Sequence, residues 1–356
     1  MADLARAGRY ARAGVRWARL LAAGRRDPGV RVFYGHDRVP APGVPAAGGT
    51  AKIQRLARRF PNHPTDFSVL YLASNWIPRD VNALLRLARR RDIPVVVNQD
   101  GVGYPGWAGN ETEQVNAPIR GLLGAADHVL YQSAFCERSV DEWVGPAPGT
   151  SEVLHNAVDV ERFTPPEEPP GGGPVLLLGG DQTQAYRLEL ALQTLAALLP
   201  SEPNAELLVT GRLVVPVEPI VDELGLAGRV HVVGRYAQSD APSIFRRAHV
   251  LLHTKVNDPC PSVVLEAMAS AVPVVYPLSG GVPELVGEDA GIGIRHPDGF
   301  ERDEPPSPEA LADAVRAVLA ERRRYSSAAR ARALAHFALE PWLDRHAEVF
   351  EMLLAR

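Results

Sequence analysis

Cysteine is scarce in this 356-residue chain, and long apolar runs are absent. Cys136 and Cys260 are its only cysteines, too few for a disulfide scaffold or a zinc site, so a reducing cytoplasm is the expected compartment. No apolar run approaches the ~20 residues that a membrane-spanning helix needs. The net charge of −4 argues against a nucleic-acid partner. These features favour a globular enzyme with room for two hydrophobic cores.

Several catalytic signatures are also missing. The sequence contains no Asp-x-Asp, so it lacks the usual metal clamp for a diphosphate, and it has no G-x-S-x-G, P-loop or His-Glu-x-x-His motif. Its ten histidines are not clustered at metal-ligand spacing. We therefore expect neither a metal site nor a cofactor.

Lysine is as rare as cysteine. Lys+Arg totals 38, yet Lys52 and Lys255 are the only lysines. Each stands beside a candidate phosphate-binding loop. Two interpretations remain open, either cationic ligands for phosphate or two lysines that lie at the surface by chance.

Residues 1–29 read as an Arg-rich helix. Arginines recur at spacings of three and four, so they share one helix face: Arg6, Arg9, Arg12, Arg16 and Arg19. One interpretation is a solvated helix packed on the protein by a few residues. The other is peripheral contact with an anionic membrane surface, on the inner face of the membrane.

The rest of the chain alternates strand and helix patterns in two α/β blocks. The first block covers residues 30–163, the linker TPPEEPPGGGP covers 164–174, and the second block covers 175–340. The C-terminal segment is helical, and Pro341 should kink or restart it, with 341–356 completing the first block. Two such blocks place a ligand in the crevice at the carboxyl ends of their strands.

The most informative stretch runs from Leu251 to Gly293. Asp258 and Glu266 flank seven residues, and Gly280-Gly281 follows a strand and precedes Pro283-Glu284. Pro261 suits the first turn of a helix, whose early amides, at Val263 and Val264, can receive a phosphate. Carboxylates accept protons from sugar hydroxyls. The stretch therefore favours a polyhydroxylated, phosphorylated ligand.

This stretch resembles the donor-binding signature of the retaining family-4 glycosyltransferases, which carry Glu, seven residues, Glu, and a later Gly-Gly-x-Pro-Glu. The resemblance implies the GT-B architecture, two Rossmann-like domains facing across a cleft. It also implies that the first domain binds the acceptor and the second the donor. The ribose contact is carried onto Glu266, the donor-sugar contact onto Asp258, and donor contacts onto Gly280 and Gly281.

Three departures from the family pattern matter. Asp258 is one methylene shorter than the usual Glu, and Pro259-Cys260-Pro261 replaces the usual Gly-Phe-Gly, which removes two backbone donors. The usual Arg and Lys after the first strand of the donor domain are missing. Arg187 is the nearest cation there, and Lys255 is expected to supply the remaining charge.

In the first block, Gly48-Gly49 occupies the position of a family Gly-Gly that lies under the donor diphosphate. A family His near residue 100 has no counterpart, so contact with the reacting sugar or the acceptor falls to Gln99 or Asp100. Tyr104 and Trp107 either stack on an acceptor ring or only pin a loop.

The reaction that the resemblance implies is retaining, metal-independent transfer of a sugar from a nucleotide diphosphate sugar to an acceptor hydroxyl. A UDP-sugar is favoured and a GDP-sugar is possible. The acceptor is a glycan, a lipid or a small molecule. Two alternatives stay open, a non-catalytic partner that binds nucleotide sugars and a GT-B nucleotide-sugar epimerase.

Overall fold

The computed structural model describes residues 17, 18, 20, 29–41, 43, 44, 46, 48–168, 170–297 and 299–356. The Arg-rich helix predicted for residues 1–29 therefore lies almost wholly outside the described residues, as does its predicted contact with a membrane. Of that segment, Trp17 donates its indole N–H to Asp80, and Leu20 is buried in the first hydrophobic core. Among the described residues, no helix has the length and apolar character to cross a bilayer.

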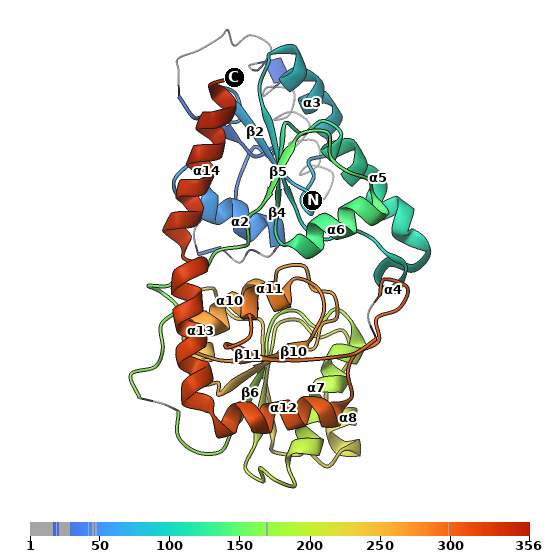
Figure 1. Cartoon of the computed structure of the whole chain (residues 1–356), viewed down its shortest axis with the longest axis vertical. Coiled ribbons are helices and arrows are strands. Elements are labelled where there is room, and N and C mark those ends of the chain that lie inside the picture. Colours follow the sequence, from blue (N-terminus) through green and yellow to red (C-terminus); the bar gives the residue numbers. More distant parts are fainter. Residues whose placement is uncertain are drawn as a thin grey trace, which may run out of the picture.

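Two parallel sheets, one above the other, form the molecule (Figure 1). The first lies in the N-terminal half, residues up to 163, and has the order β1-β2-β3-β4-β5. Its strands are β1 (Val32–Phe33), β2 (Val69–Ala73), β3 (Val95–Gln99), β4 (His128–Tyr131) and β5 (Thr150–Val153). Its helices are α2 (Gly48–Leu56), α3 (Val81–Arg90), α4 (Pro105–Ala108), α5 (Thr112–Leu123) and α6 (Ala134–Trp143), with a 3-10 turn at Gly109–Glu111.

The second sheet lies in the C-terminal half, from residue 170 onward, with the order β11-β10-β9-β6-β7-β8. Its strands are β6 (Val175–Leu178), β7 (Glu206–Thr210), β8 (Val230–Gly234), β9 (Val250–Leu252), β10 (Val274–Pro277) and β11 (Gly291–Ile294). Its helices are α7 (Ala185–Leu198), α8 (Glu218–Glu223), α9 (Ala241–Phe245), α10 (Ser262–Ala269), α11 (Val282–Val286), α12 (Pro308–Ala320) and α13 (Arg322–His336). The predicted fold class, α/β with two Rossmann-like units, is confirmed.

Apolar runs form the inner strands of each sheet because helices cover both faces there. Within β3, Val95 and Val97 belong to one core and Val96 to the core on the opposite face. Within β6, Leu177 and its neighbour Leu176 likewise belong to cores on opposite faces of the sheet. Residues that alternate between faces are thus all buried, and the strand reads as a continuous apolar run.

The second sheet has a topological switch point between β6 and β9. The chain proceeds outward from β6 to β7 and β8, then returns to β9 and proceeds the other way to β10 and β11. The loops that leave β6 and β9 at their carboxyl ends therefore diverge, and a crevice opens between them. This crevice faces the N-terminal half.

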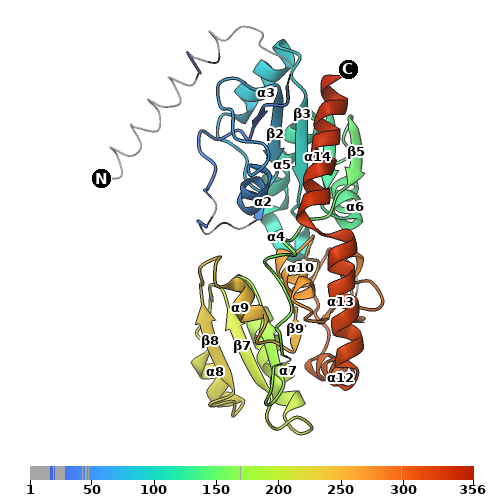
Figure 2. The ribbon, with the colours of Figure 1, turned by 90° about the vertical axis from the view of Figure 1, so that its left-hand side faces the viewer.

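The last helix, α14 (Leu339–Leu354), crosses back to the N-terminal half (Figures 1 and 2). It buries six apolar side chains against β1, β2 and α2: Leu339, Trp342, Leu343, Val349, Phe350 and Leu353. The chain breaks between α13 and α14 at Phe337–Ala338, ahead of the break predicted at Pro341. Proline tolerates the first turn of a helix, where its missing N–H has no intrahelical partner, so Pro341 stays inside α14.

Candidate active site

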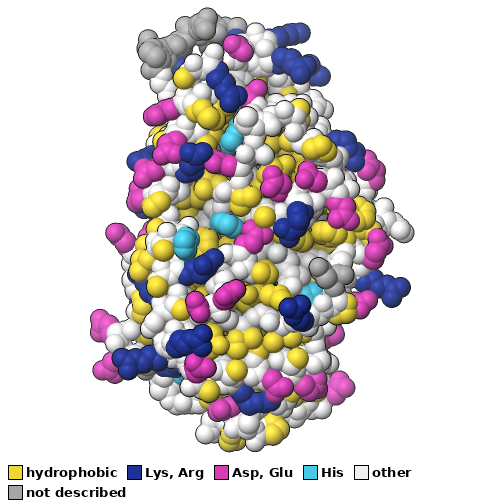
Figure 3. Space-filling model, viewed as in Figure 1, with side chains coloured by type: hydrophobic (Ala, Val, Ile, Leu, Met, Phe, Trp, Pro, Cys, Tyr) yellow, Lys and Arg dark blue, Asp and Glu magenta, His cyan; other side chains and the backbone are white. Residues whose placement is uncertain are grey.

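A cavity of about 950 Å³ lies between the two halves. The carboxyl-terminal ends of strands from both sheets border it, together with α2, α5, α6 and the start of α10. On the face shown in Figure 3, acidic and basic side chains are interspersed over both halves. The cavity is large enough for a drug-sized ligand with space left for a second one.

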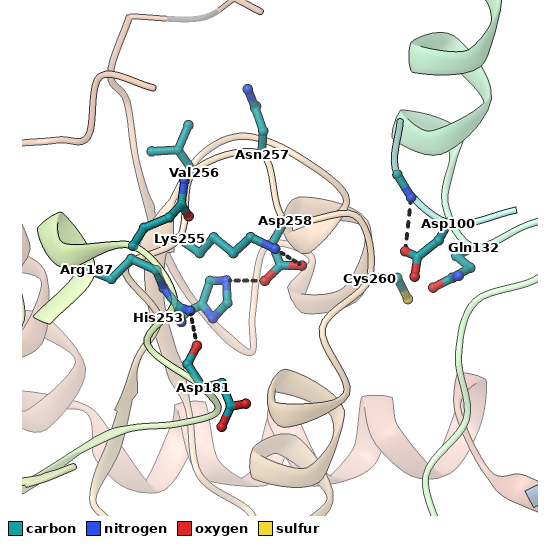
Figure 4. A network of polar contacts seen from close by, with 12 residues as sticks. Asp100, Gln132, Asp181, Arg187, His253, Lys255, Val256, Asn257, Asp258 and Cys260 are labelled. Carbon is teal, nitrogen blue, oxygen red and sulfur yellow. Dashed lines mark hydrogen bonds and ion pairs between the residues drawn. The ribbon is translucent and has the colours of Figure 1, made fainter. Parts of the chain in front are cut away.

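Asp258 stands at the centre of a charged cluster just after β9 (Figure 4). Its Oδ1 lies 3.3 Å from Lys255 Nζ, and its Oδ2 lies 3.4 Å from His253 Nε2. Burial alone would raise the pKa of Asp258, but Lys255, His253 and Arg187 outweigh burial and hold it well below its usual range. Burial lowers the pKa of His253 despite the facing carboxylate. At neutral pH the cluster therefore holds an ionised carboxylate beside a neutral imidazole.

Glu266 faces the N-terminal half across the cleft. Its Oε1 lies 3.4 Å from Arg55 Nη2, and Arg55 also donates 2.8 Å to the carbonyl of Ala157. Burial raises the pKa of Glu266, while Arg55 and Arg162 oppose that rise. The pair joins α10 to α2 and leaves the second carboxylate oxygen of Glu266 available to a ligand in the cavity, since Glu266 lines it.

A series of hydrogen-bonded, buried polar side chains begins at Lys52. Its Nζ donates 2.7 Å to Asn98 Oδ1, which also accepts from Gln132 Nε2 at 3.3 Å. Asn156 then donates to Gln132 Oε1 at 3.0 Å and to the carbonyl of Cys260 at 2.7 Å. Burial lowers the pKa of Lys52, and Asp100 partly offsets this effect. These hydrogen bonds link α2 and β3 of the N-terminal half to Cys260, just before α10.

Glu284 closes a second link between the halves. Its carboxylate accepts the backbone N–H groups of Ala134 and Phe135, at 2.7 and 2.9 Å, from the first turn of α6. His155 Nε2 lies 3.2 Å from the same carboxylate. A carboxylate is favoured at the positive end of a helix dipole, so Glu284 stabilises this arrangement of the two halves.

Residues 159–333 match the family described as Glycosyl transferases group 1. This segment, which makes up most of the C-terminal half, belongs to that glycosyltransferase family. Of characterised relatives, D-inositol 3-phosphate glycosyltransferase 1 of Catenulispora acidiphila is 26% identical over 321 residues, which cover 82% of this chain and 72% of the relative.

Solved structures agree on the GT-B fold. Sucrose-phosphate synthase from Thermosynechococcus elongatus aligns with a TM-score of 0.68 at 19% identity, over 85% of this chain and 76% of the synthase. Anabaena Alr3699/HepE in complex with UDP aligns with a TM-score of 0.65 at 17% identity, over 85% of this chain and 81% of that protein. Together with the family match over residues 159–333, these findings support a nucleotide-sugar-dependent glycosyltransferase.

Several residues predicted for the glycosyltransferase site line the cavity. From the C-terminal half these are Asp258, Lys255, Glu266 and Val263, and from the N-terminal half Gly48, Asp100, Tyr104 and Trp107. A contact between Gly101 and Pro259 brings the two groups together, because a Cβ at Gly101 would lie 2.8 Å from Pro259 Cγ. Asp100 and Asp258 thus come from opposite halves and both line the cavity (Figure 4).

Gly280 and Gly281 do not line the cavity, and their contact with the donor stays a prediction. Gly281 donates its N–H 2.9 Å to the carbonyl of Asp258. Gly280 has φ +69°, and a Cβ there would lie 2.5 Å from that same carbonyl. The Gly-Gly turn therefore supports the Asp258 loop from behind, where only glycine leaves room.

Arg187 and Val264 also lie behind the cavity wall and do not line it. Arg187 is 5% exposed and donates 2.7 Å to the carbonyl of Asp181, so it braces the turn after β6 (Figure 4). Its charge helps to lower the pKa of Asp258 and that of His253. The amide of Val264 is already bonded to the carbonyl of Pro261, at 3.1 Å, and is not free for a phosphate.

Gln99 and Gly49 do not line the cavity either, and their contacts with substrate stay predictions. Gln99 is fully buried, and its Nε2 donates to the carbonyls of Asp100 and Gly101 at 2.8 and 3.2 Å, so it shapes the loop and does not line the cavity. Gly49 is buried beneath Gly48, and a Cβ on it would lie 2.1 Å from Asn75 Oδ1. Asn75 in turn donates to the Asp100 carboxylate.

The structure places the two predicted aromatic residues differently, and their stacking on an acceptor stays a prediction. Tyr104 is 6% exposed, and its hydroxyl lies 3.4 Å from Asp303, so it pins the loop. Trp107 is 49% exposed at the edge of the cavity and leaves its ring available to a ligand. Sequence reasoning missed Arg55, His253 and the Glu284 link. For His253 a local signal existed, because it stands two residues before Lys255.

Proposed function

We propose that this glycosyltransferase transfers a sugar from a UDP-sugar to an acceptor hydroxyl with retention of anomeric configuration. The observation that carries the proposal is the ionised Asp258, held by Lys255 at the switch point and aligned with Glu266 along one wall of the cavity. Structures of Anabaena Alr3699/HepE contain UDP and UDP-glucose, and that of the pneumococcal O-GlcNAc transferase GtfA contains UDP and GlcNAc. These complexes support a uridine donor.

In the proposed reaction, the bond between the anomeric carbon and the diphosphate oxygen breaks, and a bond to the acceptor oxygen forms on the same face. The acceptor proton passes to the departing diphosphate oxygen. Lys255 and the unpaired amides at the start of α10 stabilise the charge on the diphosphate. Asp258 binds a hydroxyl of the donor sugar, and Glu266 binds the ribose.

Anomeric configuration tests this proposal. Nucleotide sugars are first screened by thermal shift, because a ligand that binds only the folded state raises the melting temperature. With an α-linked gluco- or galacto-configured donor, the product is expected to be an α-glycoside with a small anomeric coupling in proton NMR. A β-glycoside would overturn the proposal and make Asp100 the general base of an inverting reaction. Binding without release of UDP would instead indicate a binding protein or an epimerase.

Lys255→Met is expected to weaken UDP binding by about 10- to 100-fold, because a hydrogen bond to a charged group contributes roughly 1.5–3 kcal/mol. Uridine monophosphate should lose much less affinity, since Lys255 is assigned to the diphosphate. Isothermal titration of both nucleotides measures the difference. Equal losses for the two nucleotides would place Lys255 away from the diphosphate.

A further inference from the structure

One side of the cavity is apolar and belongs wholly to the N-terminal half. This apolar wall consists of Val102, Val115, Pro118, Ile119 and Phe135. Three of them stand on α5 at positions i, i+3 and i+4 and so share one face of that helix. The proposed donor contacts, Asp258, Lys255 and Glu266, lie in the opposite half. The apolar wall is therefore free for the second substrate.

None of the five residues that form the apolar wall is cationic, so none can pair with an anionic acceptor. The two cations of the N-terminal half that line the cavity are already engaged, Lys52 with Asn98 and Arg55 with Glu266. On α5 itself, Arg120 is paired with Glu113 on an exposed face, outside the cavity. Burial of a phosphate against apolar side chains without a partner is costly. An uncharged acceptor body fits this wall.

The wall also offers few hydrogen bonds to a polyol. Ser139, which borders it on α6, already donates its hydroxyl 2.6 Å to the carbonyl of Phe135. The polar groups begin at the end of the wall, where Asp100 precedes Gly101 and Gly101 contacts Pro259. A hydroxyl placed there lies between Asp100 and Asp258, on the side where the donor sugar is proposed to bind.

The far end of the wall is closed by a loop of the C-terminal half. Gly106 donates its N–H 2.7 Å to the carbonyl of Phe300. The Phe300 ring stacks on Phe135, with centroids 5.7 Å apart, and meets Tyr104 edge-on at 5.1 Å. These contacts place a loop of the C-terminal half across this end of the wall, which favours a short, rigid body. The exposed ring of Trp107 at the edge adds a flat aromatic surface.

We propose that the acceptor is an uncharged small molecule whose hydroxyl is carried on an aromatic or fused-ring body. This proposal rests on the proposed function, since it assigns the second substrate of the same site. It differs from the inositol phosphate in the name of the Catenulispora relative. A planar apolar body buries its faces against Val115, Ile119 and Trp107, while its hydroxyl reaches Asp100.

The test compares four probes in the presence of UDP: 4-methylumbelliferone, naringenin, myo-inositol 1-phosphate and glucose. Binding is followed by isothermal titration, and transfer by mass spectrometry with the donor that the thermal screen selects. The two aromatic probes are expected to bind at least 10-fold more tightly than the polar ones. Tighter binding of the inositol phosphate or of glucose would overturn the proposal.

Val115→Asp should weaken aromatic binding by at least 10-fold and leave UDP affinity within about 3-fold, because a buried carboxylate on the wall repels an apolar body. Ala117→Asp, on the exposed side of the same helix, is the matched control and should change neither. If Val115→Asp fails to fold, Val115→Thr keeps the volume and adds only a hydroxyl. Unchanged aromatic binding in the folded variant would overturn the proposal.

The outcomes also separate this proposal from the proposed function. Tight aromatic binding without sugar transfer from any donor would contradict the function and leave the assignment of the wall intact. Sugar transfer to polar acceptors alone would support the proposed function and contradict the assignment of the apolar wall.

Discussion

Asp258→Asn is expected to lower kcat for sugar transfer by about 100- to 1,000-fold, the loss typical of removing one preorganised electrostatic contact from an active site. The substitution keeps the size of the side chain and removes the charge that holds Lys255 at 3.3 Å and faces His253. UDP binding should change far less, because the proposed partner of Asp258 is the transferred sugar. Steady-state kinetics beside UDP titration measure both effects.

The exposed Asp222 on α8 provides a matched control, and Asp222→Asn should leave kcat unchanged. A second readout follows from the lowered pKa of Asp258. Its ionisation contributes stability above the unfolded-chain pKa of about 3.9, and this contribution is lost as the pH falls through the lower folded-state pKa. Asp258→Asn should flatten that acid limb of the melting profile. A variant that melts differently but turns over normally would reduce Asp258 to a structural role.

Phe350→Ala should destabilise the protein by about 3–5 kcal/mol, because it opens a cavity in a packed core. Phe350 is fully buried on α14, with its ring centroid 5.1 Å from Phe60 and 6.0 Å from Tyr71. Met352→Ala is the control, since Met352 lies on the same helix and is 40% exposed. Urea unfolding followed by circular dichroism measures both variants. A loss below about 1 kcal/mol would mean that α14 is not needed to hold the first core together.

The sequence correctly predicts those helices and strands that neighbouring residues determine. The helix predicted from about Ala134 to Trp143 is found with those bounds, because Ser133 caps it and accepts the N–H of Cys136 at 3.1 Å. It missed β5, Thr150–Val153, which is a polar edge strand without an apolar run. It also missed α5, where Pro118 stands inside the helix and breaks the usual pattern.

In the site, too, the sequence predicts the residues that are close along the chain and misses the pairs that are far apart along it. Asp258 and Glu266 lie within one loop-and-helix segment, so spacing alone could bring them to one wall of the cavity. The Arg55–Glu266 pair joins residues 211 positions apart, and the Glu284 contact with Ala134 joins residues 150 apart. Such pairs depend on how the two halves are placed, which no periodicity in the sequence encodes. For the same reason, Gly280 and Gly281 matched a family motif without lining the cavity.

The return of α14 has a consequence for synthesis on the ribosome. The first sheet is translated before the whole C-terminal half, and the helix that covers one of its faces is translated after that half. The N–H of Val158 likewise bonds the carbonyl of Phe337, which is translated much later. At 5–20 residues per second, translation of the C-terminal half takes roughly 10–40 s. Throughout that interval the nascent N-terminal half exposes apolar surface around Tyr71 and Ile53. The core of the N-terminal half is therefore complete only when α14 docks.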